Sequence, residues 1–255
     1  MPKSELYFDK PLMNAAGTLG FAPDPKGPVD IAEFGAFVTH PISRKPRKPA
    51  RGTRFVSYPG GFLLHTGLPN PGLSGAIRRY AERWVRSPIP VILHLLAQAP
   101  DELAGMVERV ELVEGIMGLE VGLPPDAAPN LVYQMAQATF GELPVILRVN
   151  LDISADIVQA IIEAGVNSIS LGAPRGTLLD DNGVPVSGRL YGPGVYPLAL
   201  KALEKFSGLG LSVIGGGGVY HTSEVDDMLK AGASAVQVGA ALWAGGIFPN
   251  TESAE

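Results

Sequence analysis

Four consecutive glycines follow an apolar, β-branched pair in the stretch V-I-G-G-G-G-V-Y (213–220). Glycine loses more backbone entropy on folding than any other residue, so such a run is either a flexible tether or a place where backbone passes close to another group. A helical pattern begins just beyond it, near Thr222 or Ser223, and either of these residues is a suitable helix cap. Glycine N–H groups and the positive end of a helix together form an anion site, so the stretch predicts a phosphate-binding loop.

The same order of strand and helix recurs along the whole chain. Short apolar runs predict eight strands, at residues 11–17, 36–39, 91–95, 117–122, 144–149, 168–172, 212–215 and 235–239. Amphipathic segments predict helices between them, at residues 29–34, 73–86, 100–114, 127–140, 154–164, 196–206 and 223–231. Eight buried strands alternating with helices are typical of an α/β fold of the TIM (β/α)8 barrel type, and a doubly wound open sheet is the alternative. No linker composition divides the chain, so we expect a single domain over residues 1–255.

Two long segments interrupt this repeat. Arg44–Asn70 follows the second strand and Arg175–Gly192 the sixth, which would place both long loops at the carboxyl end of the barrel, where active sites lie. Within the first loop, residues 55–58 and 62–65 can pair as a hairpin. In the second, D-D-N-G (180–183) predicts a turn.

The last predicted helix is short. It begins at Ala240–Ala244, and Gly245-Gly246 and Pro249 then stop it. A TIM barrel ordinarily closes with a full eighth helix. Either a partner, such as a second copy or another subunit, covers this flank, or the short segment suffices.

Composition excludes several classes of protein. The chain has no cysteine, which rules out disulfides, thiolate metal sites and cysteine nucleophiles. The net charge is −5 and the basic residues are scattered, which argues against a nucleic-acid partner. The N-terminus lacks the pattern of a signal or transit peptide, and no apolar stretch is long enough to span a bilayer. We therefore expect a cytoplasmic protein with no membrane partner, and no acidic or histidine cluster predicts a metal site.

The eighth strand supports the phosphate assignment. A-S-A-V-Q-V-G-A-A-L (233–242) ends in Gly239-Ala240 and leads into a helix start. Loops after strands 7 and 8 are the usual phosphate-binding elements of a TIM barrel. The residues alone leave three ligands open, namely a sugar phosphate, pyridoxal phosphate or flavin mononucleotide (FMN).

Several stretches together resemble the dihydroorotate dehydrogenase family, in its order and across nearly the whole chain. They are P-L-M-N-A-A-G-T-L-G (11–20), G-A-F-V-T-H (35–40), G-L-P-N-P-G-L (67–73), L-Y-G-P-G-V-Y-P-L-A-L-K (190–201) and the two glycine stretches described above. The resemblance implies a TIM-barrel flavoprotein that carries FMN and oxidises a CH–CH bond, in the family's case in pyrimidine biosynthesis.

The resemblance also implies positions for the cofactor. Backbone amides at Gly192, Gly217, Gly218, Gly239 and Ala240 match those that bind the FMN phosphate. Ala16 matches the residue that packs on the isoalloxazine ring. Three positions carry a changed side chain beside the flavin: Arg148 and His40 match family lysines, and His94 matches an asparagine. Arginine at 148 keeps the positive charge that stabilises a reduced, anionic flavin.

The substrate side departs from the family pattern. In E-V-G-L-P-P-D (120–126), Gly122 replaces a substrate-binding asparagine and Pro125 stands where the family has its catalytic base. Leu64 and Gly172-Ala173 replace further polar residues. Each substrate polar group left unpaired on burial costs about 1–3 kcal/mol. We therefore expect a small-molecule substrate other than dihydroorotate.

Other residues are candidates for the chemistry. His40, His65 and His94 fall around the predicted flavin, and His40 is the first candidate for a catalytic acid or base. Arg175 and Arg189 either clamp an anionic substrate or are solvated loop residues. The sequence thus predicts an FMN-dependent oxidoreductase, with a non-catalytic FMN- or phosphate-ligand barrel acting as a subunit as the alternative.

Overall fold

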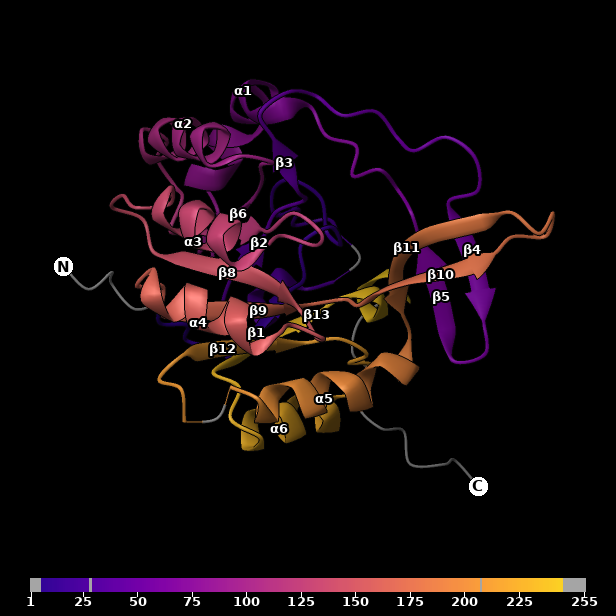
Figure 1. The fold of residues 1–255 in the computed structure, drawn as a ribbon. Coiled ribbons are helices and arrows are strands. Elements are labelled where there is room, and N and C mark those ends of the chain that lie inside the picture. The colour runs from indigo at the N-terminus through magenta and orange to yellow at the C-terminus, as the bar shows by residue number, and fades with distance from the viewer. Residues whose placement is uncertain (1–5, 28, 207, 245–255) are drawn as a thin grey trace.

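A nearly closed barrel of parallel strands forms the body of the protein (Figure 1). The structure is a computed structural model that describes residues 6–27, 29–206 and 208–244. The sheet order is β2-β6-β7-β8-β9-β12-β13-β1, and a parallel bridge from Met13 to Ala36 links its two ends. The strands are β1 (Leu12–Asn14), β2 (Phe37–Val38), β6 (Val91–Leu96), β7 (Gly118–Gly122), β8 (Val145–Asn150), β9 (Ser168–Gly172), β12 (Ser212–Gly216) and β13 (Ala235–Val238). The predicted TIM barrel and all eight predicted strands are confirmed, and the open-sheet alternative is wrong.

Asn14 reinforces the seam between β1 and β2. Its side chain is buried, its Nδ2 donates to the Val38 carbonyl at 2.7 Å, and its Oδ1 accepts from the Val38 N–H at 2.9 Å. The amide thus pairs with the β2 backbone as a neighbouring strand would. A side chain closes the barrel where the strands themselves form a single bridge.

Six helices cover the outside of the barrel in the described part of the chain (Figure 1). They are α1 (Gly72–Val85), α2 (Pro100–Glu111), α3 (Pro129–Gln137), α4 (Ala155–Glu163), α5 (Tyr196–Glu204) and α6 (Thr222–Lys230). The helix expected over residues 29–34 is only a 3₁₀ turn, η1 (Ile31–Glu33). It ends there because the Gly35 N–H bonds back to Leu12 on β1 and draws the chain into β2.

The end of the predicted final helix is only partly described. Ala240–Ala244 forms a 3₁₀ helix, η3, and Gly245-Gly246 and Pro249 lie outside the described residues. A further 3₁₀ turn, η2 (Pro193–Val195), leads into α5. No helix among the described residues is both long and apolar enough to cross a membrane.

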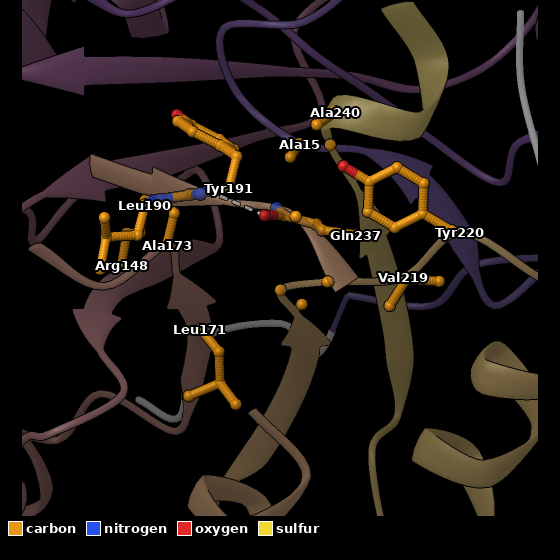
Figure 2. A pocket seen from close by; sticks show the side chains of 15 residues that line it. Ala15, Arg148, Leu171, Ala173, Leu190, Tyr191, Val219, Tyr220, Gln237 and Ala240 are labelled. Atoms are coloured by element: carbon orange, nitrogen blue, oxygen red, sulfur yellow. Dashed lines mark hydrogen bonds between the residues drawn. The ribbon is translucent and has the colours of Figure 1, made fainter. Parts of the chain in front are cut away.

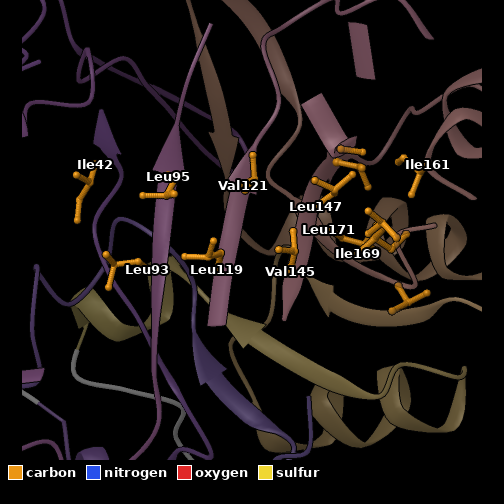
Figure 3. Close-up of a cluster of buried hydrophobic side chains, with 14 of the residues drawn as sticks. Ile42, Leu93, Leu95, Leu119, Val121, Val145, Leu147, Ile161, Ile169 and Leu171 are labelled. Atoms are coloured by element: carbon orange, nitrogen blue, oxygen red, sulfur yellow. The ribbon is translucent and has the colours of Figure 1, made fainter. Parts of the chain in front are cut away.

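Strand side chains alternate between two apolar layers. One set packs outward against the helices, and Figure 3 shows its members on four neighbouring strands, including Leu93, Leu119, Leu147 and Leu171. The opposite set contains no helix residue and lies inside the barrel; it is formed by Met13, Ala36, Val38, Ile92, Ile146, Ile214 and Ala235. The period-two pattern of the strands therefore produces a core on each side of the sheet.

A second, antiparallel sheet projects beside the barrel (Figure 1). Its order is β10-β11-β5-β4, from β4 (Phe55–Tyr58), β5 (Gly61–Leu64), β10 (Arg175–Leu179) and β11 (Pro185–Tyr191). The predicted hairpin in the first long loop is confirmed. The second segment is not an open loop as expected but a hairpin, because β11 finds a distant partner in β5. The predicted turn at Asp180–Gly183 joins β10 to β11.

The second barrel strand is broken at the site. β2 and β3 (Ile42–Ser43) both pair with β6, and His40-Pro41 lies between them. Proline has no N–H for the ladder, so the strand is interrupted there. The break leaves His40 at the carboxyl end of the barrel.

Candidate functional site

A layer of polar side chains lies inside the barrel above the apolar inner core. Glu120 is fully buried at its centre and accepts hydrogen bonds from side chains on four other strands, β6, β8, β9 and β13. The His94 Nδ1 lies 2.5 Å from Oε2, and the Ser170 Oγ and Gln237 Nε2 each lie 2.6 Å from Oε1. Arg148 adds an ion pair at 3.3 Å and donates to the Gln237 Oε1 at 2.8 Å. Five strands thus contribute to one connected network.

The charges in this network are divided unequally. Burial alone would raise the pKa of the Glu120 carboxyl, but Arg148, His94 and Ser170 outweigh it and hold that pKa well below its usual range. Burial lowers the pKa of His94, and the nearby Arg148 lowers it further against the opposing effect of Glu120. Glu120 is therefore ionised and His94 neutral at neutral pH. An ionised carboxylate only accepts, so His94 donates its Nδ1–H and keeps a lone pair on Nε2.

Two glycines make room for the large side chains of this layer. A Cβ at Gly122 would lie 2.9 Å from His94 Nε2 and 2.9 Å from a Leu96 methyl group. A Cβ at Gly172 would lie 3.1 Å from Arg148 Nε. Gly122 and Gly172 are two of the positions at which we expect the sequence to depart from the family pattern. Each leaves the room that a large neighbouring side chain, His94 or Arg148, occupies.

The predicted phosphate loops do come together. A narrow cavity of about 30 Å³ is bordered by all five predicted phosphate-binding positions, Gly192, Gly217, Gly218, Gly239 and Ala240. Arg148, Tyr191 and Tyr220 border it as well (Figure 2). The N–H groups of Gly217, Gly218 and Gly239 donate no hydrogen bond to another described residue. Gly218 has a φ of 72°, and a Cβ there would lie 2.3 Å from the Tyr196 nitrogen. No residue but glycine fits that backbone.

The neighbouring helix is arranged differently from the prediction. Helix α6 begins at Thr222 with His221 as its N-cap residue, so neither Thr222 nor Ser223 caps it. The Glu224 carboxylate accepts from the Tyr220 N–H at 2.6 Å and the His221 N–H at 3.0 Å. An acidic side chain therefore already lies at the positive end of α6. The anion-binding capacity of this region lies in the glycine amides rather than in the helix.

His40 lines a second cavity with an unsatisfied nitrogen. This cavity, of about 170 Å³, is bordered by Ala16, His40, His94 and Arg148 among other residues, and shares Arg148 and Tyr191 with the first. The His40 Nε2 is buried and has no hydrogen-bond partner among the described residues, while the ring bonds to the backbone of Gly17. Burial lowers the pKa of His40. Its ring is thus neutral at neutral pH.

A third cavity, of about 330 Å³, lies under the second sheet. The loop Gly122–Pro125 borders it, together with His65, Arg175 and Arg189. His65 thus lies apart from His40 and His94. Leu123, Pro124 and Pro125 present no group that can take up a proton. The structure therefore places no base at the position that the sequence comparison identified.

The residues that sequence reasoning missed are Glu120, Ser170, Gln237 and Tyr191. Glu120 and Gln237 are each the single polar residue of an otherwise apolar strand. Both occupy alternate positions that face the barrel interior, as Ile92 and Ile146 do on their strands. That pattern was visible in the sequence. Tyr191 borders all three cavities because β11 pairs with β5, which no local pattern indicates.

Comparison with known proteins identifies the family. The sequence profile described as "Dihydroorotate dehydrogenase" matches residues 4–252. Among the similar proteins are those named "Dihydroorotate dehydrogenase B (NAD(+)), catalytic subunit" from Pelobacter propionicus and Trichlorobacter lovleyi, each 31% identical over 92% of this chain and 84% of the relative. The protein of that name from Desulforudis audaxviator is 29% identical with the same coverage. Their names support an oxidoreductase in general, and the chain belongs to the dihydroorotate dehydrogenase family.

Proposed function

We propose that the protein is an FMN-dependent oxidoreductase whose substrate is a small molecule other than dihydroorotate. One observation carries the cofactor assignment: the buried His40 Nε2, without a partner, borders a cavity that shares Arg148 and Tyr191 with the cavity at the glycine loops. A buried polar atom without a partner costs free energy unless a ligand pairs with it. The family membership supports FMN as the ligand that fills the connected cavities, with the substrate bound on it as the group that meets the His40 Nε2.

The residues present fit this cofactor. The free amides of Gly217, Gly218 and Gly239 would hold the phosphate, and Ala16, His40, His94 and Arg148 would border the ring. Bound FMN supplies a hydride acceptor for the site. Arg148 keeps its side chain in place through Glu120 and Gln237, so its charge is fixed beside the cavity.

Two features support a substrate other than dihydroorotate. The polar partners that the family uses are absent at Leu64, Gly122 and Gly172. The room beside the two glycines is occupied by His94 and Arg148, as the Cβ distances show. A substrate with the amide and carboxylate groups of dihydroorotate would leave several of them unpaired, at about 1–3 kcal/mol each.

His40 is the residue that we assign to proton transfer. It is neutral, and since its other nitrogen bonds to the Gly17 backbone, Nε2 is free to accept. In this proposal His40 takes the proton that leaves the substrate carbon, a role that Pro125 cannot fill. General-base catalysis of this kind contributes about 10²–10⁴-fold to the rate.

Reconstitution with FMN tests the cofactor. We expect the visible flavin spectrum to be retained after removal of free FMN. Gly218→Ala should lose it, because its Cβ would strike Tyr196, whereas the matched variant Gly210→Ala should keep it. Gly210 has a similar φ of 71°, but no other described residue lies within 4 Å of the position of its Cβ. Failure of the wild-type protein to bind FMN would refute the proposal.

Anaerobic mixing tests the substrate and the base. Dihydroorotate should leave the flavin oxidised, and rapid bleaching by it would refute the claim that its site is lost. With a carbon donor that does bleach the flavin, His40→Ala should slow the reaction by about 10²–10⁴-fold. His221→Ala, which removes an exposed histidine that lines none of the three cavities, is the control and should react at the wild-type rate.

A second candidate is a non-catalytic barrel that binds FMN and serves as a subunit. It is favoured by the loop Gly122–Pro125, which borders the third cavity without any proton-transferring group. The relatives are named as catalytic subunits, so a partner subunit for this chain is part of either candidate. Bound flavin that no donor reduces, with or without His40, would favour this second candidate.

A further inference from the structure

Three arginines border the third cavity. Arg47, Arg175 and Arg189 contribute to its wall, whereas the described residues that line it include no aspartate or glutamate. The rest of the wall is largely apolar, from Leu64, Leu68, Leu96, Leu123, Pro124, Pro125 and Tyr191. The protein as a whole carries a net charge of −5, so this concentration of positive charge is local.

Arg189 is the innermost of the three. It is partly buried on β11 and borders the second and third cavities. Its Nη1 donates to the Ala173 carbonyl at 2.8 Å, and the guanidinium makes no other hydrogen bond to a described residue. Burial lowers the pKa of Arg189 to about 10, and the charge of Arg148 adds to that effect. The group remains charged at neutral pH, with most of its donors unused.

Arg175 stands directly opposite Arg189 across the hairpin. The two are register partners in the β10–β11 ladder. Like charges at opposite positions of an antiparallel pair destabilise the sheet. Neither arginine forms an ion pair within the described part of the chain, and neither does Arg47. Asp126 and Asp152 border a neighbouring cavity with Arg189 but are not paired with it.

Arg148 differs from these three because its charge is compensated. It lies against the ionised Glu120 inside the barrel. Arg189 has no such partner among the described residues, and the positive charge of Arg148 further disfavours the charged form of Arg189. An anion in the third cavity would relieve both the repulsion between Arg175 and Arg189 and the cost of burying Arg189.

We propose that the third cavity binds a small organic dianion, with one anionic group held by Arg189 and Arg175 and the second reached by Arg47. Guanidinium groups bind carboxylate and phosphate in a bidentate manner, and the two register partners present their forks from neighbouring strands. The apolar wall accommodates the carbon body of the ligand. The proposal deepens the proposed function, on which it rests for calling this ligand the substrate.

Calorimetric titration of the FMN-reconstituted protein tests the site. Succinate and butyrate are the probes, because they have the same number of carbons and differ by one carboxylate; both are titrated at constant ionic strength. Succinate should bind at least tenfold more tightly than butyrate, a difference of about 1.4 kcal/mol. Arg189→Gln should weaken succinate binding at least tenfold and Arg175→Gln severalfold. Arg51→Gln, which removes an exposed arginine outside the cavity, should leave binding unchanged.

Each outcome bears on the proposal. Absence of succinate binding, or equal binding by wild type and Arg189→Gln, would overturn it. Binding of inorganic phosphate that depends on Arg189, without any preference for succinate over butyrate, would also overturn it, since the site would then take any anion. The same titrations on protein without FMN separate this test from the cofactor assignment. Succinate binding in a protein that never takes up FMN would refute the proposed function but leave the anion site standing.

Discussion

Replacing Glu120 by glutamine should destabilise the protein more strongly than any change on its surface. The fully buried carboxylate accepts hydrogen bonds from His94, Ser170 and Gln237 and pairs with Arg148. Glutamine keeps the volume but removes the negative charge. It leaves Arg148, which is 11% exposed, as an uncompensated cation. Removing one partner of a buried ion pair costs about 3–5 kcal/mol. At about 2–4 °C per kcal/mol for a chain of this size, Tm should fall by about 6–20 °C.

A double-mutant cycle separates this pair from the packing around it. Arg148→Met leaves Glu120 buried without its cation and should also destabilise strongly. Glu120→Gln combined with Arg148→Met removes both charges, so its effect should be smaller than the sum of the single effects by about 0.5–3 kcal/mol. Urea unfolding followed by near-UV circular dichroism gives the free energies of unfolding, and flavin retention reports the cavity separately.

The control is an ion pair that is exposed to solvent. Glu82 on α1 and Arg86, the C-cap residue of that helix, are exposed and their side chains lie 3.8 Å apart, so Glu82→Gln should change stability by less than about 1 kcal/mol. The reasoning is refuted if Glu120→Gln costs no more than Glu82→Gln. It is also refuted if the effects of Glu120→Gln and Arg148→Met are simply additive, because Arg148 would then not depend on Glu120.

Two further predictions concern the same layer. Gly122→Ala should destabilise the protein by about 1–3 kcal/mol, because its Cβ would push His94 away from Glu120. The control is Gly105→Ala on α2, which should stabilise it by about 0.5–1 kcal/mol, because no described residue lies within 4 Å of the new Cβ. Thermal unfolding of both variants measures the two effects. Acidification should also destabilise the protein, since burial lowers the pKa of His40 and His94 from the model-compound value of 6.5. The unfolded chain takes up both protons as pH falls below 6.5 while the folded chain does not, so stability present above that pH is lost below it. Unfolding measured across that range in wild type and His40→Gln should show a shallower loss in the variant, and identical profiles would contradict the assignment.

Periodicity in the sequence was enough to predict the barrel. Each barrel strand lies in a short apolar run, and each is followed by a turn or a helix start, so local patterns predicted all eight strands. The failures are equally informative. The β10–β11 hairpin exists because β11 pairs with β5, a partner far away in the chain. The segment at 29–34 fails to form a helix because Gly35 bonds to Leu12. Both depend on long-range contacts that no window of sequence contains.

The site was only partly predictable, because single residues could be predicted from the sequence but the carboxylate that connects them could not. The glycine loops, His40, His94 and Arg148 were identified one at a time, and the structure shows that His94 and Arg148 are held by the same carboxylate. Glu120 was overlooked because a lone glutamate in an apolar strand has no motif of its own. The sequence does show that Glu120 occupies an inward-facing alternate position of its strand, as do the polar residues at 94, 148, 170 and 237 on theirs. A set of isolated polar residues at one parity of successive strands predicts a buried network, because none of them can be satisfied alone.

The buried network around Glu120 occupies the space beside Gly122 and Gly172, the two glycines that lack the polar side chains of the family pattern. A glycine such as Gly122 would ordinarily be interpreted as a simple deletion that one substitution could reverse. Here the lost volume is filled, since His94 Nε2 lies 2.9 Å from where a Cβ would be, and His94 is held in place by Glu120. The same holds for Gly172 and Arg148. Restoring an asparagine at 122 alone would therefore displace His94 from its carboxylate instead of adding a hydrogen-bond donor to the cavity. Under the proposed change of substrate, specificity lies in pairs of residues, so only paired substitutions, at 94 with 122 and at 148 with 172, would recreate the room that a different substrate needs.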